Sequence, residues 1–233
     1  MWTVQDSLSI FIFNKFGEME TLMKDLRHQI AIFSTYNKLI PDLYKKLSSV
    51  FPDEILNANM NSNLDTPGVP PEIPRLEIFI RNDVQINCSR NRFDLFTPTY
   101  NDAINILDRL KDNFLYSGIS RVGLIITKFI DIDKADYKEK ICNLFPTIDT
   151  INVSEFGLRI NCPDNIEISG INIGFNHLQN IELGEVSGAK GYIYQQDINT
   201  KIEESGKLTD NIDHVKLLIQ HSHSFFTQKR LVG

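Results

Sequence analysis

The chain has 233 residues, 42% of them hydrophobic and 23% charged, and its formal net charge is −6. A chain of this length and composition can bury a full core, so we expect one large or two small globular domains. The excess of 30 acidic over 24 basic residues argues against broad, sequence-independent binding to nucleic acid, which depends on many contacts with phosphates. The apolar runs fall short of the roughly 18 residues that a transmembrane helix needs, so we expect no membrane partner.

The three cysteines, Cys88, Cys142 and Cys162, are widely spaced and form no CxxC pair. This pattern predicts reduced thiols rather than a disulfide framework or a zinc site. The first apolar run is preceded by Asp6 without an early lysine or arginine, which is unlike a secretory signal peptide. We therefore expect a cytoplasmic protein.

The N-terminal part contains three expected elements. Residues 8–13 form an apolar run rich in β-branched and aromatic side chains, which predicts a strand. Apolar residues then recur at gaps of three and four between positions 18 and 34, which predicts an amphipathic helix. A second helical segment is expected over residues 43–50, between two prolines.

Residues 57–74 differ in character, because they contain four asparagines, four prolines and little that could be buried. Such a segment cannot offset its ordering entropy with apolar burial, so it is predicted to be a long polar loop. A single expected strand precedes it. We therefore interpret it as an excursion within one domain, residues 1–233, rather than as a domain boundary.

The next segment is the most clearly patterned part of the chain. A strand over residues 76–80, a turn at Asn82-Asp83 and a return strand over residues 84–96 predict a β-hairpin. A helix is expected over residues 100–116, with Gly118 supplying the left-handed residue that ends it. A strand over residues 122–130 follows.

The remaining elements are a short helix capped by Asp133, three strands and a final helix capped by Thr209. The strands are expected over residues 151–161, 166–175 and 190–198, and the final helix over residues 210–230. Strands joined by turns predict an α+β fold: a mainly antiparallel sheet of about six to seven strands with helices packed against it. Strands followed by a helix occur twice, so the chain could consist of two similar halves.

Asp131, Asp133 and Asp136 come closest to a metal motif, because carboxylates at alternating positions can converge on a hard cation. The EF-hand spacing fails, however, since Ala135 and Cys142 stand where two of its ligands belong. We favour a strand end followed by a helix N-cap, and we predict no cofactor.

His214, His221 and His223 lie in the final expected helix, at spacings that do not match helical zinc ligands. We expect them to face solvent or a partner.

Five arginines surround the expected hairpin and its neighbouring strand: Arg75, Arg81, Arg90, Arg92 and Arg121. They could receive an acidic partner or a phosphate. The alternative, which we favour, is that they cover a solvated face and discourage edge pairing, because the chain is acidic and no aromatic residues for base stacking accompany them. If a partner binds, we expect it to contact the loop at 57–74 together with Arg81, Arg90 and Arg92.

The sequence contains no GxSxG, Walker or GxGxxG motif. We therefore favour a non-catalytic protein that binds another protein, and we favour nucleic acid less. Two alternatives stay open. One is a small metal-dependent nuclease or hydrolase that uses Asp131, Asp133 and Asp136, and the other is an RNA- or DNA-binding subunit that uses the arginines.

Several patches also carry a family resemblance: residues 74–76, Asp83, residues 91–95, Tyr100, residues 121–124 and residues 212–228. Together they resemble a sporadically distributed bacterial family of proteins that has no established activity. The family is scattered among genomes as mobile or defence-linked genes often are. The resemblance implies the same element order, a prokaryotic or phage origin, and a role in bacterial defence or phage counter-defence.

Overall fold

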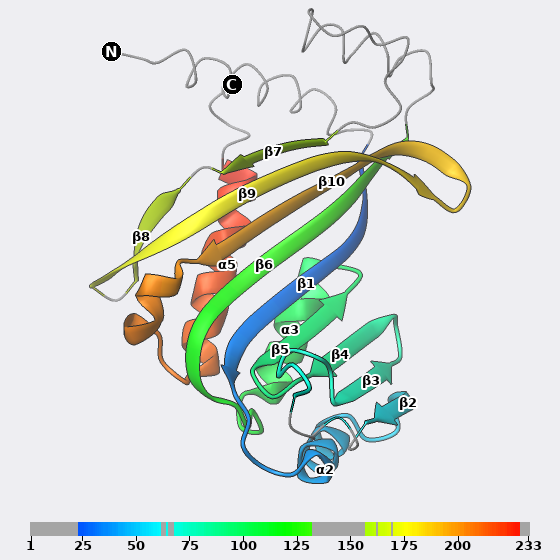
Figure 1. Cartoon of the computed structure of the whole chain (residues 1–233), viewed down its shortest axis with the longest axis vertical. Coiled ribbons are helices and arrows are strands. Elements are labelled where there is room, and N and C mark those ends of the chain that lie inside the picture. The colour runs from blue at the N-terminus through cyan, green and yellow to red at the C-terminus, as the bar shows by residue number, and fades with distance from the viewer. Residues whose placement is uncertain are drawn as a thin grey trace, which may run out of the picture.

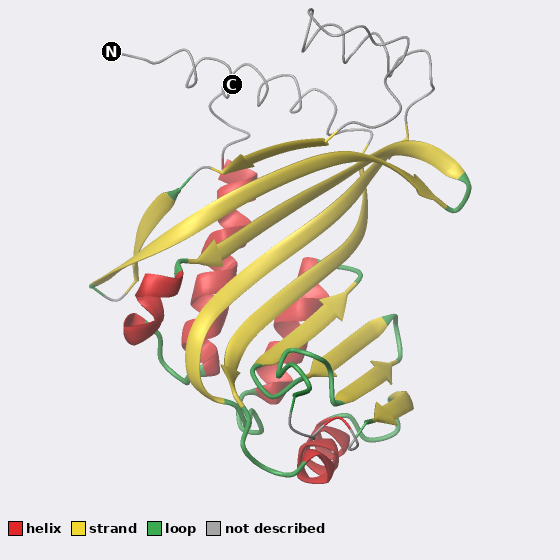
Figure 2. Ribbon diagram, viewed as in Figure 1, coloured by secondary structure: helices red, strands yellow, loops and turns green. Residues whose placement is uncertain are grey.

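The computed structural model describes residues 23–61, 64, 68–131, 157–161, 163–168 and 170–228. These residues form one antiparallel sheet with helices packed against it, which confirms the expected α+β class (Figures 1 and 2). The sheet has ten strands rather than the six to seven expected. The strands are β1 (Met23–Thr35), β2 (Ile55–Met60), β3 (Leu76–Ile80), β4 (Val84–Cys88), β5 (Arg92–Thr97), β6 (Ser117–Asp131), β7 (Gly157–Asn161), β8 (Asp164–Ile168), β9 (Ile171–Val186) and β10 (Ala189–Thr200). The helices are α2 (Ile40–Val50), α3 (Tyr100–Leu110), the 3₁₀ helix η4 (Ile202–Lys207) and α5 (Ile212–Gln228).

The long strands β1 and β6 lie side by side in the middle of the sheet. Outward from β1 the order is β5, β4, β3 and β2, and outward from β6 it is β10 and β9. β7 and β8 pair with successive stretches of β9 on either side of Pro163, so they occupy one edge position. In the first run of strands, β1 to β5, the last strand pairs with the first, and the chain then continues into α3. In the second run, β6 to β10, the last strand likewise pairs with the first, and the chain continues into η4 and α5.

The segment expected to be a helix at 18–34 is a strand from Met23 onward. Ile30 and Ile32 lie on the helix-covered face and are fully buried, whereas Phe33 faces the other side. β1 pairs with β5 on one edge and β6 on the other, so ladder hydrogen bonds satisfy its backbone. Tertiary pairing here outweighs a helix-like apolar spacing, as it often does where a strand is buried.

The expected hairpin is a three-stranded meander. Asn82 and Asp83 both have a positive φ, at 63° and 58°, and form the expected turn. The return strand is broken after β4, because Ser89 N–H donates to the Arg92 carbonyl at 2.8 Å and closes a second turn. The expected strand over residues 166–175 likewise breaks at Gly170, whose φ of +80° favours glycine.

α3 begins where expected, and the Thr99 hydroxyl caps it by accepting from Asp102 N–H at 3.2 Å. It ends at Leu110 rather than at Tyr116, because Asn113 N–H donates to the Leu110 carbonyl and turns the chain back toward the sheet. The Tyr116 ring then packs on Phe93 with centroids 5.8 Å apart. Gly118 has a positive φ but lies in β6, so it does not end the helix.

α5 begins after Asn211, whose side-chain oxygen accepts from Asp213 N–H at 2.8 Å, so Asn211 rather than Thr209 is the cap. α5 runs antiparallel to α3. The His223 ring stacks on Tyr100 at 3.6 Å near one end of the pair, and Lys111 pairs with Asp213 at 2.7 Å near the other.

Three further comparisons with the expected elements can be made. α2 contains the expected helix at 43–50, and β10 contains the expected strand at 190–198. Residues 57–60 of the expected loop belong to strand β2 instead. The strand expected at 8–13, the helix capped by Asp133 and residues 151–156 lie outside the described residues. None of the described helices is long and apolar enough to cross a membrane.

Candidate functional site

The sheet has one face covered by helices and one that the described helices leave open. In Figure 1 the ribbon of β5 passes in front of α3 and that of β6 in front of α5, so the viewer looks at this open face. Leu124 and Ile126 of β6 point to the helices and are buried. The alternate residues of each strand point to the open face, as the pleat requires.

Three side chains from three adjacent strands lie in a row on the open face. Phe33 of β1 pairs with Arg92 of β5 on one side and with Arg121 of β6 on the other. The guanidinium carbons of Arg92 and Arg121 lie 4.9 Å and 5.2 Å from the centre of the Phe33 ring. Both arginines are therefore placed for cation–π contact with one ring. We call these three residues the arginine–phenylalanine row.

The arginine–phenylalanine row is held by an acidic neighbour. Asp94 Oδ1 accepts from Arg92 Nε at 2.8 Å and from Gln29 Nε2 at 2.8 Å. Such charge-assisted bonds fix Arg92 in place. Arg121 differs, because its Nε is buried and has no hydrogen-bond partner among the described residues. The row thus contains one arginine whose charge is paired and one with an unused donor.

Small residues follow the arginine–phenylalanine row at the centre of the open face. Ala31 of β1 pairs with Gly123 of β6, and Gly123 pairs with Asn199 of β10. Asn199 is only 2% exposed, and its Nδ2 donates to Asp197 at 2.8 Å. Its Oδ1 is a buried acceptor for which the described part of the chain supplies no donor. Buried polar atoms of this kind are uncommon and call for an explanation.

The open face combines balanced charge with many amides. Its paired positions carry twelve amide side chains: Gln29, Asn57, Asn59, Gln85, Asn87, Asn161, Asn165, Asn172, Asn176, Asn180, Gln195 and Asn199. Among the side chains that the structure describes, these positions carry five basic residues (Lys24, Arg27, Arg92, Arg121 and Arg159) and five acidic residues (Glu77, Asp94, Glu167, Glu182 and Asp197). The described side chains of the face are therefore neutral on balance and rich in groups that both donate and accept hydrogen bonds.

The structure separates the three arginines expected to bind a partner. Arg81 is exposed in the turn between β3 and β4, whereas Arg90 lies in the turn after β4. The five residues of β4 put these turns about 17 Å apart, at the usual rise per residue of a strand. Arg90 donates to the carbonyls of Tyr36 at 3.2 Å and Lys38 at 2.5 Å. Arg92 alone of the three lies on the open face.

The expectation that no aromatic residues accompany the arginines is wrong. Arg92 and Arg121 flank Phe33, and Arg27 lies over the Phe96 ring at 3.5 Å from its centre. The misassignment of β1 concealed this arrangement, because a helix would have separated Phe33 from both partners. The sequence did contain a signal for this strand, because Arg27, Gln29, Ala31 and Phe33 occupy every second position.

The metal candidates gain no support from the residues that the structure describes. Asp131 is the last residue of β6, and Asp133 and Asp136 lie outside the described residues. The described ranges contain no group of three or more His, Cys, Asp or Glu side chains that could hold a metal ion.

The three histidines of α5, which we expected to face solvent or a partner, are half-buried, and each contacts a side chain of this chain. His223 stacks on Tyr100, and His214 Nδ1 lies 2.8 Å from the Thr209 hydroxyl. His221 contacts the Phe175 ring and lines a cavity of about 10 Å³ together with Asp164 and other side chains of β8–β10. Burial lowers the pKa of His221. A cavity this small holds at most one water molecule.

Comparison of the chain with protein-family models and with curated proteins finds no match.

Proposed function

We propose that the protein is a non-catalytic binding protein that docks another protein on the open face of its sheet. The observation that supports this proposal is the arginine–phenylalanine row of Arg92, Phe33 and Arg121 on a face that the described helices leave open. Aromatic and arginine side chains are the residue types that contribute most to protein interfaces. Asp94 restricts the Arg92 side chain before a partner arrives, which lowers the entropic cost of association.

The charge balance and the amides of the open face favour a protein over other partners. Five basic and five acidic residues create no net field that would attract a polyanion. Amide side chains bind peptide groups and polar side chains equally well, since each amide both donates and accepts.

A second candidate is binding of single-stranded nucleic acid on the same face. Phenylalanine rings with stacked arginines resemble the platforms on which bases stack, and amides can contact base edges. The five carboxylates of the face oppose this candidate, because they repel phosphates. A setting in bacterial defence or phage counter-defence rests on the sequence resemblance alone.

The test compares two variants of the tagged protein, expressed in its native host and purified with its partners. Phe33→Ala removes the ring between Arg92 and Arg121, and Arg81→Ala removes an exposed arginine away from the row. We expect a partner protein to co-purify with wild type and with Arg81→Ala in the same ratio. The amount of this partner that co-purifies with Phe33→Ala should be at least tenfold lower. Circular dichroism checks that both variants are folded. A partner retained equally by both variants contradicts the proposal.

Labelled single-stranded DNA and RNA test the second candidate. Binding that Phe33→Ala removes, and that weakens steeply as salt rises, would favour nucleic acid over protein.

A further inference from the structure

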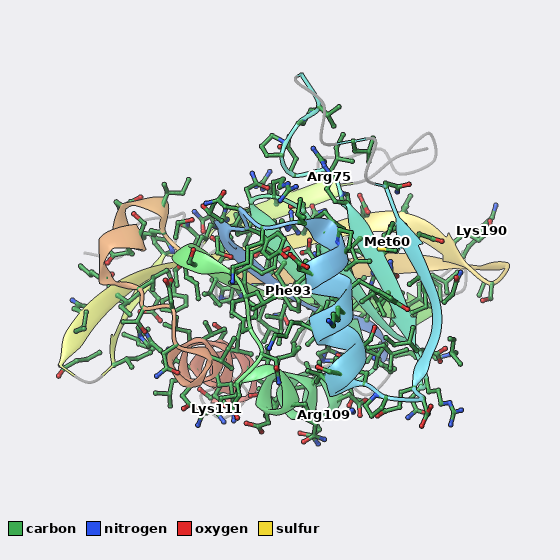
Figure 3. All side chains as sticks on the ribbon, turned by 90° about the horizontal axis from the view of Figure 1, so that it is seen from below. Met60, Arg75, Phe93, Arg109, Lys111 and Lys190 are labelled. Carbon is green, nitrogen blue, oxygen red and sulfur yellow. The ribbon has the colours of Figure 1, made fainter. Side chains whose placement is uncertain are left out.

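A hollow of about 410 Å³ lies beside α2, at the end of the molecule that faces the viewer in Figure 3. Its volume is within the range of small-molecule sites. We call it the α2 hollow. It is lined by Lys38, Asp42, Lys45, Lys46, Ser49 and Leu115.

The fold brings these side chains together from three segments. Asp42, Lys45, Lys46 and Ser49 follow one another at helical spacings of three and four, so they share the outer face of α2. Lys38 comes from the connection before α2, and Leu115 comes from the connection after α3. The hollow is therefore a product of tertiary structure and not of one helix alone.

The connection that carries Lys38 is firmly held. Arg90 donates to the Lys38 carbonyl at 2.5 Å, and the Tyr36 hydroxyl donates to the Leu39 carbonyl at 2.8 Å. These bonds fix the backbone on both sides of the Lys38 side chain. The Lys38 side chain itself is exposed, so a ligand has to order this side chain but not the backbone that carries it.

The lining of the α2 hollow carries an excess of positive charge. Within the described ranges, none of Lys38, Lys45 and Lys46 forms an ion pair with a carboxylate. Other lysines are paired: Lys111 with Asp213, Lys128 with Asp25 and Lys207 with Glu204. Three lysine ammoniums and the Asp42 carboxylate give the hollow a net charge of +2, in a chain whose net charge is −6.

We propose that the α2 hollow binds a small molecule that carries a phosphate group. A phosphate monoester has a charge of about −1.5 to −2 at neutral pH, which matches the net charge of the lining. Lysine is a common phosphate ligand and acts as a compact point charge. Leu115 is the one apolar residue of the lining and contacts the organic part of the ligand.

The test titrates inorganic phosphate and phenyl phosphate into ¹⁵N-labelled protein at constant ionic strength and follows the backbone amides of α2. We expect saturable shifts at Lys46 and Ser49, with phenyl phosphate binding more tightly because its ring can contact Leu115. The double variant Lys45→Gln/Lys46→Gln should weaken binding by about 25-fold or more, if each exposed charge contributes roughly a factor of five. The matched control is Lys190→Gln, which removes an exposed lysine in the β9–β10 hairpin and should leave the titration unchanged.

Asp42→Asn gives a second readout of opposite sign. It removes the carboxylate of the lining, so phosphate affinity should rise about fivefold by the same reasoning. A site in which these residues serve only the fold would not bind more tightly after this change. The proposal is overturned if neither ligand gives saturable shifts by about 10 mM, where a millimolar site would be mostly filled. It is also overturned if the double lysine variant titrates like wild type. Because Phe33 does not line the hollow, these outcomes can be distinguished from those of the test of the open face.

Discussion

Arg81 and Arg90 lie on the same meander but have different roles. Arg90 reaches two backbone carbonyls of the connection before α2, and its guanidinium also approaches the Tyr36 ring. Arg81 is exposed, and its side chain projects from a turn. Reversing the charge of Arg81, Arg90 and Arg92 together would therefore disturb the fold as well as any interface, so it is a poor test of binding.

Arg90→Ala should lower the free energy of unfolding by about 1–3 kcal/mol, because it removes charge-assisted hydrogen bonds to two carbonyls. Arg81→Ala should change it by less than about 0.5 kcal/mol, as surface substitutions usually do. Urea unfolding followed by circular dichroism measures both values. Equal effects of the two substitutions would show that the Arg90 contacts add nothing to stability.

Cys88 should make stability fall at alkaline pH. The thiol is fully buried, and burial raises its pKa from its ordinary value of 9.0 to about 12. The neutral form is favoured in the folded state, so this contribution is fully present below pH 9 and is lost as pH rises toward 12. In that window the unfolded chain releases a proton that the folded chain keeps, which adds a slope of about 1.4 kcal/mol per pH unit.

The measurement is the free energy of unfolding from pH 8 to 10.5 for wild type and Cys88→Ala. Tyr36 also makes the protein less stable as pH rises, because burial raises the pKa of its hydroxyl to about 12. Wild type and Cys88→Ala share that effect. The stability advantage of wild type should therefore shrink above pH 9. A difference that stays constant across the range would contradict the assignment of a neutral, buried Cys88.

At the scale of elements, α3 is fixed by one buried face. Leu107 is fully buried, and the exposed Asn105 lies two residues before it on the opposite side. Leu107→Asp would bury an unpaired carboxylate and should unfold or aggregate the protein. Asn105→Asp adds the same group in solvent and should shift the melting temperature by no more than a degree or two. Thermal melts compare them, and similar melting temperatures would show that α3 does not bury this face.

Gly191 controls how closely β10 can approach β6. A Cβ atom at this position would lie 2.1 Å from the Ile130 carbonyl oxygen, which belongs to the backbone and cannot move aside cheaply. Gly191→Ala should therefore cost about 2–4 kcal/mol, as overpacking of a rigid site does. Gly206→Ala is the matched control, since nothing lies within 4 Å of its Cβ position. A chemical denaturation curve for Gly191→Ala that overlays that of Gly206→Ala would contradict this close packing.

The elements were predictable wherever local sequence decides them. The Asn82-Asp83 turn, the start of α3 and the 43–50 helix follow from turn residues, caps and apolar spacing. β1 was not predictable in this way, because Ile30 and Ile32 are strand residues only when β5 and β6 pair on both sides. The open face depends on that pairing. Arg92 and Arg121 were visible as arginines, but their shared contact with Phe33 exists only across three strands.

At the scale of the whole molecule, the two runs of strands meet along β1 and β6 and share one hydrophobic cluster. The cluster extends from Leu43 of α2 through Leu107 of α3 to Leu218 of α5. The α3–α5 pair adds ion pairs at Lys111–Asp213 and Lys216–Asp108. The two runs share a strand order, and the shared cluster indicates that neither run would bury its core alone.

We therefore predict that the chain unfolds in a single cooperative transition, as one domain. Hydrogen exchange in the native state should give the same opening free energy for β4, in the first run of strands, and for β9, in the second. Gly191→Ala provides the decisive comparison, because it perturbs β10 and lies far along the sheet from β4. If the halves fold as one unit, this substitution lowers the opening free energy of β4 and β9 by equal amounts, since both report global unfolding. If the opening free energy of β9 fell while that of β4 stayed unchanged, the two runs of strands would be separate folding units joined along β1 and β6.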